Sequence, residues 1–178
     1  MNLNNVELLN FERDSFDQLI AWANEPEILM QFAGPDFVFP LTRKQLEKSI
    51  NEPLRRSFAV RLNSTMQIIG HAEIYLNNDN AHLCRILIGE ESMRGKGIGQ
   101  QIVQELLRIS FQELNCKNAS LNVYDWNTMA INCYTRAGFQ VSDEPKNSSE
   151  ISGETWVSSK MILNRERWES VRAINGIL

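Results

Sequence analysis

The sequence predicts one domain of the mixed α+β class, with a mostly antiparallel sheet and flanking helices. Its 178 residues favour a single domain spanning 1–178, and a chain of this length buries a core without disulfides or metals. Three consecutive strand patterns indicate an antiparallel meander, whereas a parallel sheet would alternate strands with helices. The composition, 43% hydrophobic and 22% charged, is typical of a globular domain.

The N-terminal part predicts one strand followed by two helices. Ser15 and Gln18 have the spacing of a capping box, as do Thr42 and Gln45, so each pair marks the start of a helix. Pro26 ends or kinks the first of these helices. The expected elements are a strand at Asn5–Phe11, a helix from Ser15 to Glu25, an aromatic loop at Gly34–Leu41 and a helix from Thr42 to about Asn51.

The rest of the chain predicts the meander and further helices packed on it. Apolar residues at helical spacing between Ile98 and Leu114 indicate an amphipathic helix, and Gly138 is a natural left-handed end for the next one. Strands are expected at Ser57–Leu62, Gln67–Asn77, His82–Gly89, Ala119–Tyr124, Phe139–Ser142 and Thr155–Leu163. The next helix is expected at Thr128–Ala137, a polar loop at Asp143–Gly153, and a short helix after Asn164.

Charge and cysteine content exclude several classes of function. The net charge of −4 argues against DNA or RNA as the main partner, because phosphate neutralisation needs clustered Lys and Arg, and it fits a cationic substrate. The three cysteines, Cys84, Cys116 and Cys133, show neither metal-ligand spacing nor a secreted disulfide pattern. With no signal peptide and no apolar run of ~20 residues, we expect a cytoplasmic protein without a metal or a membrane partner.

The segment Arg94–Gly99 is the most specific chemical feature of the sequence. Its glycines, at 95, 97 and 99, let the backbone turn successive N–H groups inward at the start of a helix, which creates an anion nest. Arg94 and Lys96 add charge-assisted contacts to a phosphate. The spacing matches neither a Walker A loop nor GxGxxG, and the alternative is a tight strand–helix turn with incidental basic residues.

Two motifs, in this order, resemble the GNAT superfamily of N-acetyltransferases. Arg94–Gly99 matches the R/Q-x-x-G-x-G/A signature for acetyl-CoA in that family. A second segment resembles N-x-x-A-x-x-x-Y-x-x-x-G-F and is carried by Asn127, Ala130, Tyr134, Gly138 and Phe139. The resemblance covers residues 5–163, and the layout is closest to the ribosomal-protein alanine and spermidine acetyltransferase types.

The resemblance implies the GNAT fold, in which a twisted sheet of about seven strands parts at the cofactor cleft. The strands that part should be His82–Gly89 and Ala119–Tyr124, with acetyl-CoA as the co-substrate between them. Parting would free backbone groups for the pantetheine arm, while the glycine loop would hold the pyrophosphate. The implied cofactor contacts are Leu87, Ile88, Gly89, Arg94, Gly95, Lys96, Gly97, Ile98, Gly99, Asn127 and Asn132.

The implied reaction is direct attack of a primary amine on the thioester in a ternary complex. Tyr134 occupies the family's proton-donor position for the departing thiolate; a core tyrosine that packs the helix is the alternative. An alkylamine has a pKa near ~10, so a base must remove its proton. Glu73 is the candidate base on a central strand, with His71 and His82 as alternatives. Asn127 could equally serve as a plain helix N-cap.

The sequence leaves three functional hypotheses: an N-acetyltransferase, a non-catalytic CoA-binding or regulatory module on the same fold, and a different nucleotide-phosphate binder. Tyr134 favours the enzyme over the module, and the second motif argues against the third hypothesis. The acceptor stays open among a small-molecule amine, a polyamine and a protein N-terminus, since one fold serves many acceptors. The family suggests a homodimer. The aromatic segment 32–39 is expected either to line the acceptor pocket or to pack as a lid.

Overall fold

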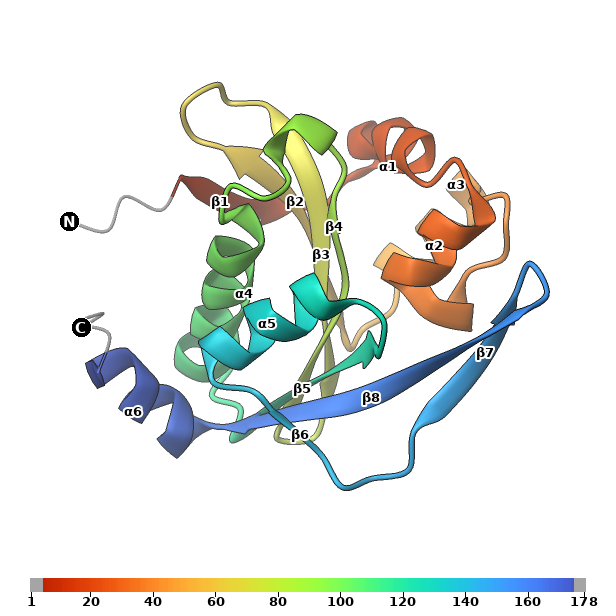
Figure 1. The fold of residues 1–178 in the computed structure, drawn as a ribbon. Helices are drawn as coiled ribbons and strands as arrows, with labels where there is room; N and C mark the ends of the chain where they lie inside the picture. The colour runs from red at the N-terminus through yellow and green to blue at the C-terminus, as the bar shows by residue number, and fades with distance from the viewer. Residues whose placement is uncertain (1–4, 175–178) are drawn as a thin grey trace.

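The computed structural model describes residues 5–174 and shows an eight-stranded sheet with helices on both faces (Figure 1). The strand order is β1-β2-β3-β4-β5-β8-β6, and β7 pairs with β8. The strands are β1 (Val6–Asn10), β2 (Arg55–Leu62), β3 (Ile68–Asn77), β4 (Asn80–Ile88), β5 (Asn118–Tyr124), β6 (Gln140–Val141), β7 (Asn147–Ile151) and β8 (Glu154–Asn164). The predicted α+β class and mostly antiparallel sheet are confirmed. The predicted domain also includes residues 1–4 and 175–178, which lie outside the described residues.

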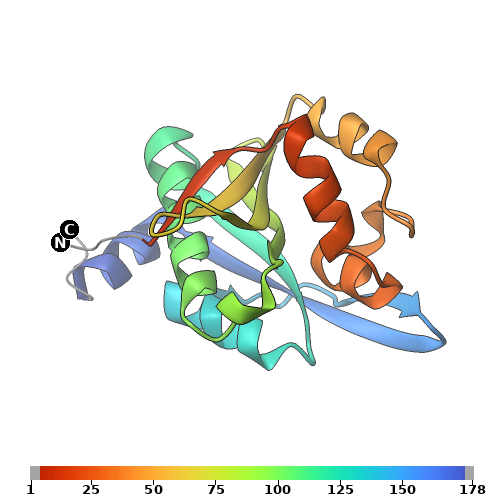
Figure 2. The ribbon, with the colours of Figure 1, turned by 90° about the horizontal axis from the view of Figure 1, so that it is seen from above.

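The helices form two groups. Figure 2 shows α1, α2 and α3 together on one side of the sheet, away from α4 and α5. The helices are α1 (Phe16–Trp22), α2 (Pro26–Ala33), α3 (Arg43–Ile50), α4 (Ile98–Arg108), α5 (Thr128–Ala137) and α6 (Arg165–Ile174). Short 3-10 turns lie at Arg13–Ser15, Gly34–Asp36 and Glu91–Met93, and α4 continues into a π-helical segment at Ile109–Glu113. None of these helices is both long enough and apolar enough to cross a membrane.

Two hydrophobic cores hold these layers together, one on each face of the sheet. The larger core joins the apolar stripe of α4, including Ile102, to Ala81 and Leu83 of β4. The smaller core joins α1, α2 and α3 to the opposite face. Because side chains alternate along a strand, the side chains of His82 and Cys84 point away from the larger core, toward the face that carries α2 and α3.

The sheet parts between β4 and β5. These two strands are parallel and pair only where Asn80–His82 meets Asn118–Ser120, and beyond that point they separate. Every other neighbouring pair of strands is antiparallel and most are paired along much of their length. A parallel pair needs a crossover connection, and α4 supplies it between β4 and β5. The expected parting of these strands is therefore present, and the glycine loop lies at the end of β4 that leads into α4.

A β-bulge interrupts β4 opposite β3. The register shifts between His71 and Glu73 of β3, and Arg85 of β4 adopts a positive φ of 51°. A bulge changes the direction in which the following side chains point. Regular alternation would send Arg85 to the same core as Leu83, but the bulge turns it toward α3, where it bonds Ser49. The alternation of residues along the chain does not reveal this change in the direction of the Arg85 side chain.

The N-terminal helices differ from the prediction in two respects. The first helix ends before Pro26 as predicted, since α1 stops at Trp22, but the sequence did not predict that Pro26 begins a further helix, α2. At that position the missing N–H of Pro26 costs nothing, because the group has no helical partner. Ser15 makes no capping hydrogen bond, since a 3-10 turn precedes it, and the Gln18 side chain instead donates to the Ile68 carbonyl at 3.2 Å. The Thr42 cap is confirmed, with its hydroxyl accepting from the Gln45 N–H at 3.3 Å.

The polar segment Asp143–Gly153 is also different from its prediction as a loop. It contains β7, which forms a hairpin with β8 through a turn at Ser152 and Gly153. Its sequence, NSSEI, has little β propensity, so pairing with a long neighbouring strand decides its conformation. Near the C-terminus the predicted cap is confirmed, because the Asn164 side chain accepts from the Arg167 N–H at 2.8 Å.

Candidate active site

The glycine loop ends at the first turn of α4, as the sequence predicts. Gly95 and Gly97 have φ values of 74° and 78°, in the left-handed region that favours glycine. A Cβ on either residue would meet no atom within 4 Å, so the loop borders open space rather than packed side chains. Gly97 is also the N-cap of α4, whose first N–H groups have no partner within a helix. This geometry fits an anionic group such as a pyrophosphate.

The other residues of the loop differ in their surroundings. The Arg94 Nε donates to the Ile88 carbonyl at 3.0 Å, and its guanidinium pairs with Glu91 at 3.4 Å. Arg94 therefore braces the loop against the end of β4, while Lys96 is exposed. Ile98 is buried in the larger core and Gly99 lies within α4. These two residues therefore fix the direction of the helix and offer no side chain to a ligand.

The backbone groups at the end of β4 point in different directions. The Gly89 N–H donates to the Ile69 carbonyl of β3 at 2.9 Å. The Leu87 carbonyl also faces β3, because a Cβ on Gly70 would lie 2.3 Å from its oxygen. Alternation therefore turns the N–H and C=O of Ile88 toward the gap between β4 and β5. The Ile88 carbonyl already accepts from Arg94 Nε at 3.0 Å, so within residues 5–174 only the Ile88 N–H is left for a ligand, whereas the carbonyl of Leu87 and the N–H of Gly89 belong to the sheet.

Tyr134 lies two turns into α5 and is half-buried against the larger core. Its ring meets Phe139 edge-on, with 6.1 Å between the ring centroids. Burial raises the pKa of the Tyr134 phenol, and Cys133 adds to this shift. The phenol therefore keeps its proton at neutral pH, which suits a proton donor.

Asn127 and Asn132 occupy different positions on α5. Asn127 is the N-cap of the helix, and its side-chain oxygen accepts from the Ala130 N–H at 3.2 Å. The N-cap alternative is thus present, and it uses only the oxygen of the amide, so the NH₂ group can make a second contact. Asn132 lies on the exposed side of α5.

A cavity of about 1180 Å³ lies on the face of the sheet that carries α2 and α3. Helices α2 and α3 form one wall, β5, β7 and β8 contribute the other, and β2, β3 and β4 contribute Arg55, Tyr75 and His82. Asn122 and Tyr124 lie on the wall beyond the point where β5 leaves β4. The cavity therefore borders the same gap that the glycine loop borders from the other end.

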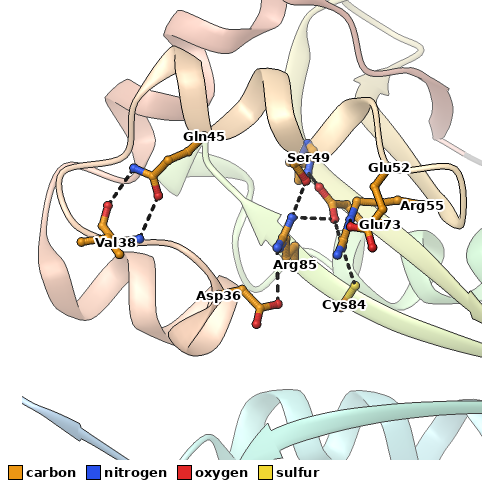
Figure 3. A network of polar contacts seen from close by, with 10 residues as sticks. Asp36, Val38, Gln45, Ser49, Glu52, Arg55, Glu73, Cys84 and Arg85 are labelled. Atoms are coloured by element: carbon orange, nitrogen blue, oxygen red, sulfur yellow. Dashed lines mark hydrogen bonds and ion pairs between the residues drawn. The ribbon is translucent and has the colours of Figure 1, made fainter.

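Glu73 is the centre of a buried network of polar contacts (Figure 3). Its Oε2 accepts from Arg55 at 2.6 Å and from Arg85 at 3.1 Å, and its Oε1 lies 3.0 Å from His71 Nε2. Burial alone would raise the pKa of Glu73, but the hydrogen bond from His71 and the charges of Arg85 and Arg55 outweigh it and lower the pKa. A carboxylate held in this way has little tendency to take a proton, so the geometry disfavours Glu73 as the general base.

His82 lines the cavity at the point where β4 and β5 part. Its Nδ1 lies 3.1 Å from the Ser120 hydroxyl, which also accepts from the Asn80 side chain at 2.9 Å. Burial lowers the pKa of His82, and the charge of Lys160 lowers it further. The imidazole is therefore neutral at physiological pH and can accept a proton.

Two aromatic residues of segment 32–39 pack in the smaller core and also line the cavity. Phe32 and Phe37 are buried in the smaller core and also border the cavity, so lid packing and pocket lining are combined in one element. Phe39 is 42% exposed. Two residues of the cavity wall, Arg55 and Arg85, were missed from the sequence because nothing local distinguishes them from solvated strand residues.

A sheet that parts between two parallel strands, with a glycine loop and a helix N-terminus at one end of the gap and a polar cavity at the other, is the arrangement expected of an acyltransferase that uses a nucleotide-linked thioester. The family model for "Acetyltransferase (GNAT) family" matches residues 16–139. The chain belongs to this family, and it is an acetyl-CoA-dependent N-acetyltransferase.

Solved structures with the same fold include spermidine N-acetyltransferase from Vibrio cholerae in complex with CoA and spermine. The two chains are 22% identical and superpose with a TM-score of 0.78, covering 93% of this chain and 98% of that one. A dodecameric form of the Vibrio cholerae enzyme is 20% identical and gives a TM-score of 0.74, covering 92% of this chain and 96% of that chain.

Proposed function

We propose that this enzyme acetylates a primary amine by direct attack in a ternary complex, with Tyr134 donating a proton to the CoA thiolate. The observation that carries the proposal is the parting of β4 from β5 beside the glycine nest at the start of α4. Acetyl-CoA supplies an activated acyl group when it is bound there. The nest and Lys96 would hold its pyrophosphate, the Ile88 N–H and Asn127 would hold its amides, and Arg94 would keep the loop in place through its bond to the Ile88 carbonyl.

Direct attack is favoured over a covalent acetyl-cysteine intermediate. Cys84 lines the cavity and Cys133 lies beside Tyr134, so both thiols are near the site. Burial raises the pKa of Cys84 to about 12, with Glu73 adding to the shift, and burial also raises the pKa of Cys133. The thiolate is the nucleophilic form of cysteine, so neither side chain is prepared to attack a thioester at neutral pH.

The acceptor amine must lose a proton before it attacks, because an alkylammonium has a pKa near ~10. We propose His82 as the general base in place of Glu73, with water in the cavity carrying the proton to it. Its neutral imidazole on the cavity wall and its fixed orientation at Ser120 support this role. The retained Tyr134 supports an enzyme over a non-catalytic CoA-binding module.

We propose that the acceptor is a primary amine. The candidates are small-molecule amines, polyamines and protein N-termini; the complex of the Vibrio cholerae enzyme with spermine supports including polyamines. The dodecamer formed by that enzyme supports self-association here, and we propose that this chain forms at least a homodimer.

Release of free CoA thiol from acetyl-CoA across an amine panel tests the proposed function. Replacing Tyr134→Phe removes the phenol but keeps the ring, so kcat should fall by about a hundredfold or more, as general acid catalysis contributes that much. The affinity for CoA should stay within a factor of about two, because the ring packing is kept. An unchanged kcat would show that Tyr134 is only a core tyrosine, and no thiol release with any amine would contradict the function itself.

A further inference from the structure

The floor of the acceptor cavity carries two arginines whose hydrogen-bonding capacity exceeds what the protein uses. Resting on the proposed function, we propose that Arg55 and Arg85 bind a carboxylate group of the acceptor, so that the substrate is an amine that also bears a carboxylate. The acceptor would then be anchored at its acidic end while its amine reaches the gap between β4 and β5.

The two guanidinium groups lie side by side. The Nη1 atoms of both arginines bind the same oxygen of Glu73, at 2.6 Å and 3.1 Å. Their side chains are 9% and 5% exposed, and both residues line the cavity. The β4 bulge is what brings Arg85 to this face, beside Arg55 from β2.

Parts of both guanidiniums are free for a ligand. Arg55 uses Nε for Glu52 and Nη1 for Glu73, and its Nη2 has no hydrogen bond to any residue in 5–174. That Nη2 is also absent from the enclosed polar atoms that lack a partner, so it reaches open space. The Nη2 of Arg85 meets only Asp36, at a long 3.4 Å, and the Asp36 side chain is 64% exposed. Asp36 is thus a loosely held occupant that a substrate carboxylate can displace (Figure 3).

The charges around the cavity favour an acceptor that is not purely cationic. Arg55, Arg85 and Lys48 on the wall face two carboxylates, Asp36 and Glu52. Glu73 lies behind the wall, and with its negative charge included the net charge of these six side chains is zero. A polyamine with several ammonium groups would meet no surplus of carboxylates here, whereas a carboxylate would find donors in the planar geometry that guanidinium offers.

An acceptor panel with matched pairs tests this proposal on the whole enzyme. Glycine, β-alanine and γ-aminobutyrate are each compared with their carboxamides, and spermidine is included. The preferred carboxylate should exceed its carboxamide by about tenfold or more in kcat/KM, in line with a charge-assisted hydrogen bond. Equal rates for every pair, or spermidine as the better acceptor, would overturn the proposal. Thiol release with spermidine alone would leave the acetyltransferase function standing, which separates the two conclusions.

A second experiment uses the loosely held aspartate. Asp36→Asn removes the competitor for Arg85, so KM for the preferred carboxylate acceptor should fall about threefold or more, since a weak, exposed ion pair is being relieved. The same change should raise KM if the acceptor site instead recognises a cation. Asp17→Asn is the matched control, because Asp17 pairs with Arg43 at 2.5 Å on the surface, outside the cavity. A rise in KM in Asp36→Asn would contradict the carboxylate assignment.

A third experiment addresses the arginines themselves without depending on the fraction of folded enzyme. Arg85→Lys keeps the charge beside Glu73 but loses the fork that binds a carboxylate at two points. The ratio of carboxylate to carboxamide rates, measured within this one variant, should fall toward one. A ratio that stays at its wild-type value would show that Arg85 serves only the buried network.

Discussion

At the residue scale, His82 and Glu73 differ in how their surroundings control a proton. Glu73 is 1% exposed and is surrounded by His71, Arg55 and Arg85, so its proton is lost well below neutral pH and it acts as an anchor for cations. The charge of Asp36 favours protonation of His82, but burial and the charges of Lys160 and Arg55 outweigh it, lower the pKa of His82 and keep the imidazole neutral. The sequence placed both residues on central strands, but only their spatial neighbours distinguish an anchor from a base.

The titration of His82 gives a prediction for the pH dependence of kcat. Because the pKa of His82 is lowered from its usual value of 6.5, the base form is lost only as the pH falls below that value. Activity should therefore rise through a step on the acid side of pH 6.5 and level off above it. In His82→Gln this step should disappear, and kcat should fall by about a hundredfold or more.

The second histidine provides the comparison. His71 lies outside the cavity wall and bonds Glu73. His71→Gln should keep the acid-side step even if it lowers the stability of the protein. If the step survives in His82→Gln, the proton must leave through another group.

At the element scale, the local chemistry of turns and caps explains most of what was predictable. The glycine loop, the Thr42 and Asn164 caps and the apolar stripe of α4 depend on residues within a few positions of one another. Elements that depend on distant partners were missed. β7 is a strand because β8 extends beside it. The start of α2 at Pro26 is a local signal that was interpreted only as the end of the helix before it.

Two glycines allow the loop to be tested with a matched control. Gly97 and Gly153 have similar φ values, 78° and 82°, and both border open space, but Gly153 lies in the β7–β8 turn. Alanine at either position should lower the free energy of unfolding by about 1 kcal/mol, since left-handed backbone is unfavourable for residues with a Cβ.

Only one of the two substitutions should affect the cofactor. In Gly97→Ala the added methyl enters the space next to the start of α4, so CoA affinity measured by titration calorimetry should fall about tenfold or more, equivalent to ~1.4 kcal/mol. Gly153→Ala should bind CoA as the wild type does. Equal affinities for both variants would place the pyrophosphate elsewhere.

At the scale of the whole molecule, the parting of β4 from β5 leaves the sheet incomplete until a ligand fills it. The gap lies between the two cores, so a ligand bound there contacts elements of both. CoA at about a hundred times its Kd should stabilise the fold by ~2.7 kcal/mol. For a chain of 178 residues this corresponds to a rise in Tm of about 5–10 °C.

The same measurement separates the CoA compounds from other nucleotides. Acetyl-CoA and CoA should raise Tm, whereas ATP and NAD lack the pantetheine arm that we propose pairs with the Ile88 N–H, and they should have little effect. A similar rise with ATP would mean that the glycine loop alone recognises a phosphate.

The sequence by itself determined the fold class, the family and the glycine nest, because each depends on residue order and on interactions between near neighbours. It also indicated Tyr134, through its spacing from Asn127 and Gly138 along one helix. The tertiary structure alone decided that Glu73 is an anchor, that the Ile88 N–H faces the gap while its carbonyl binds Arg94, and that Arg55 and Arg85 share a cavity floor. Those outcomes depend on strand register, on one bulge and on burial, and these are set by contacts between residues far apart in the chain.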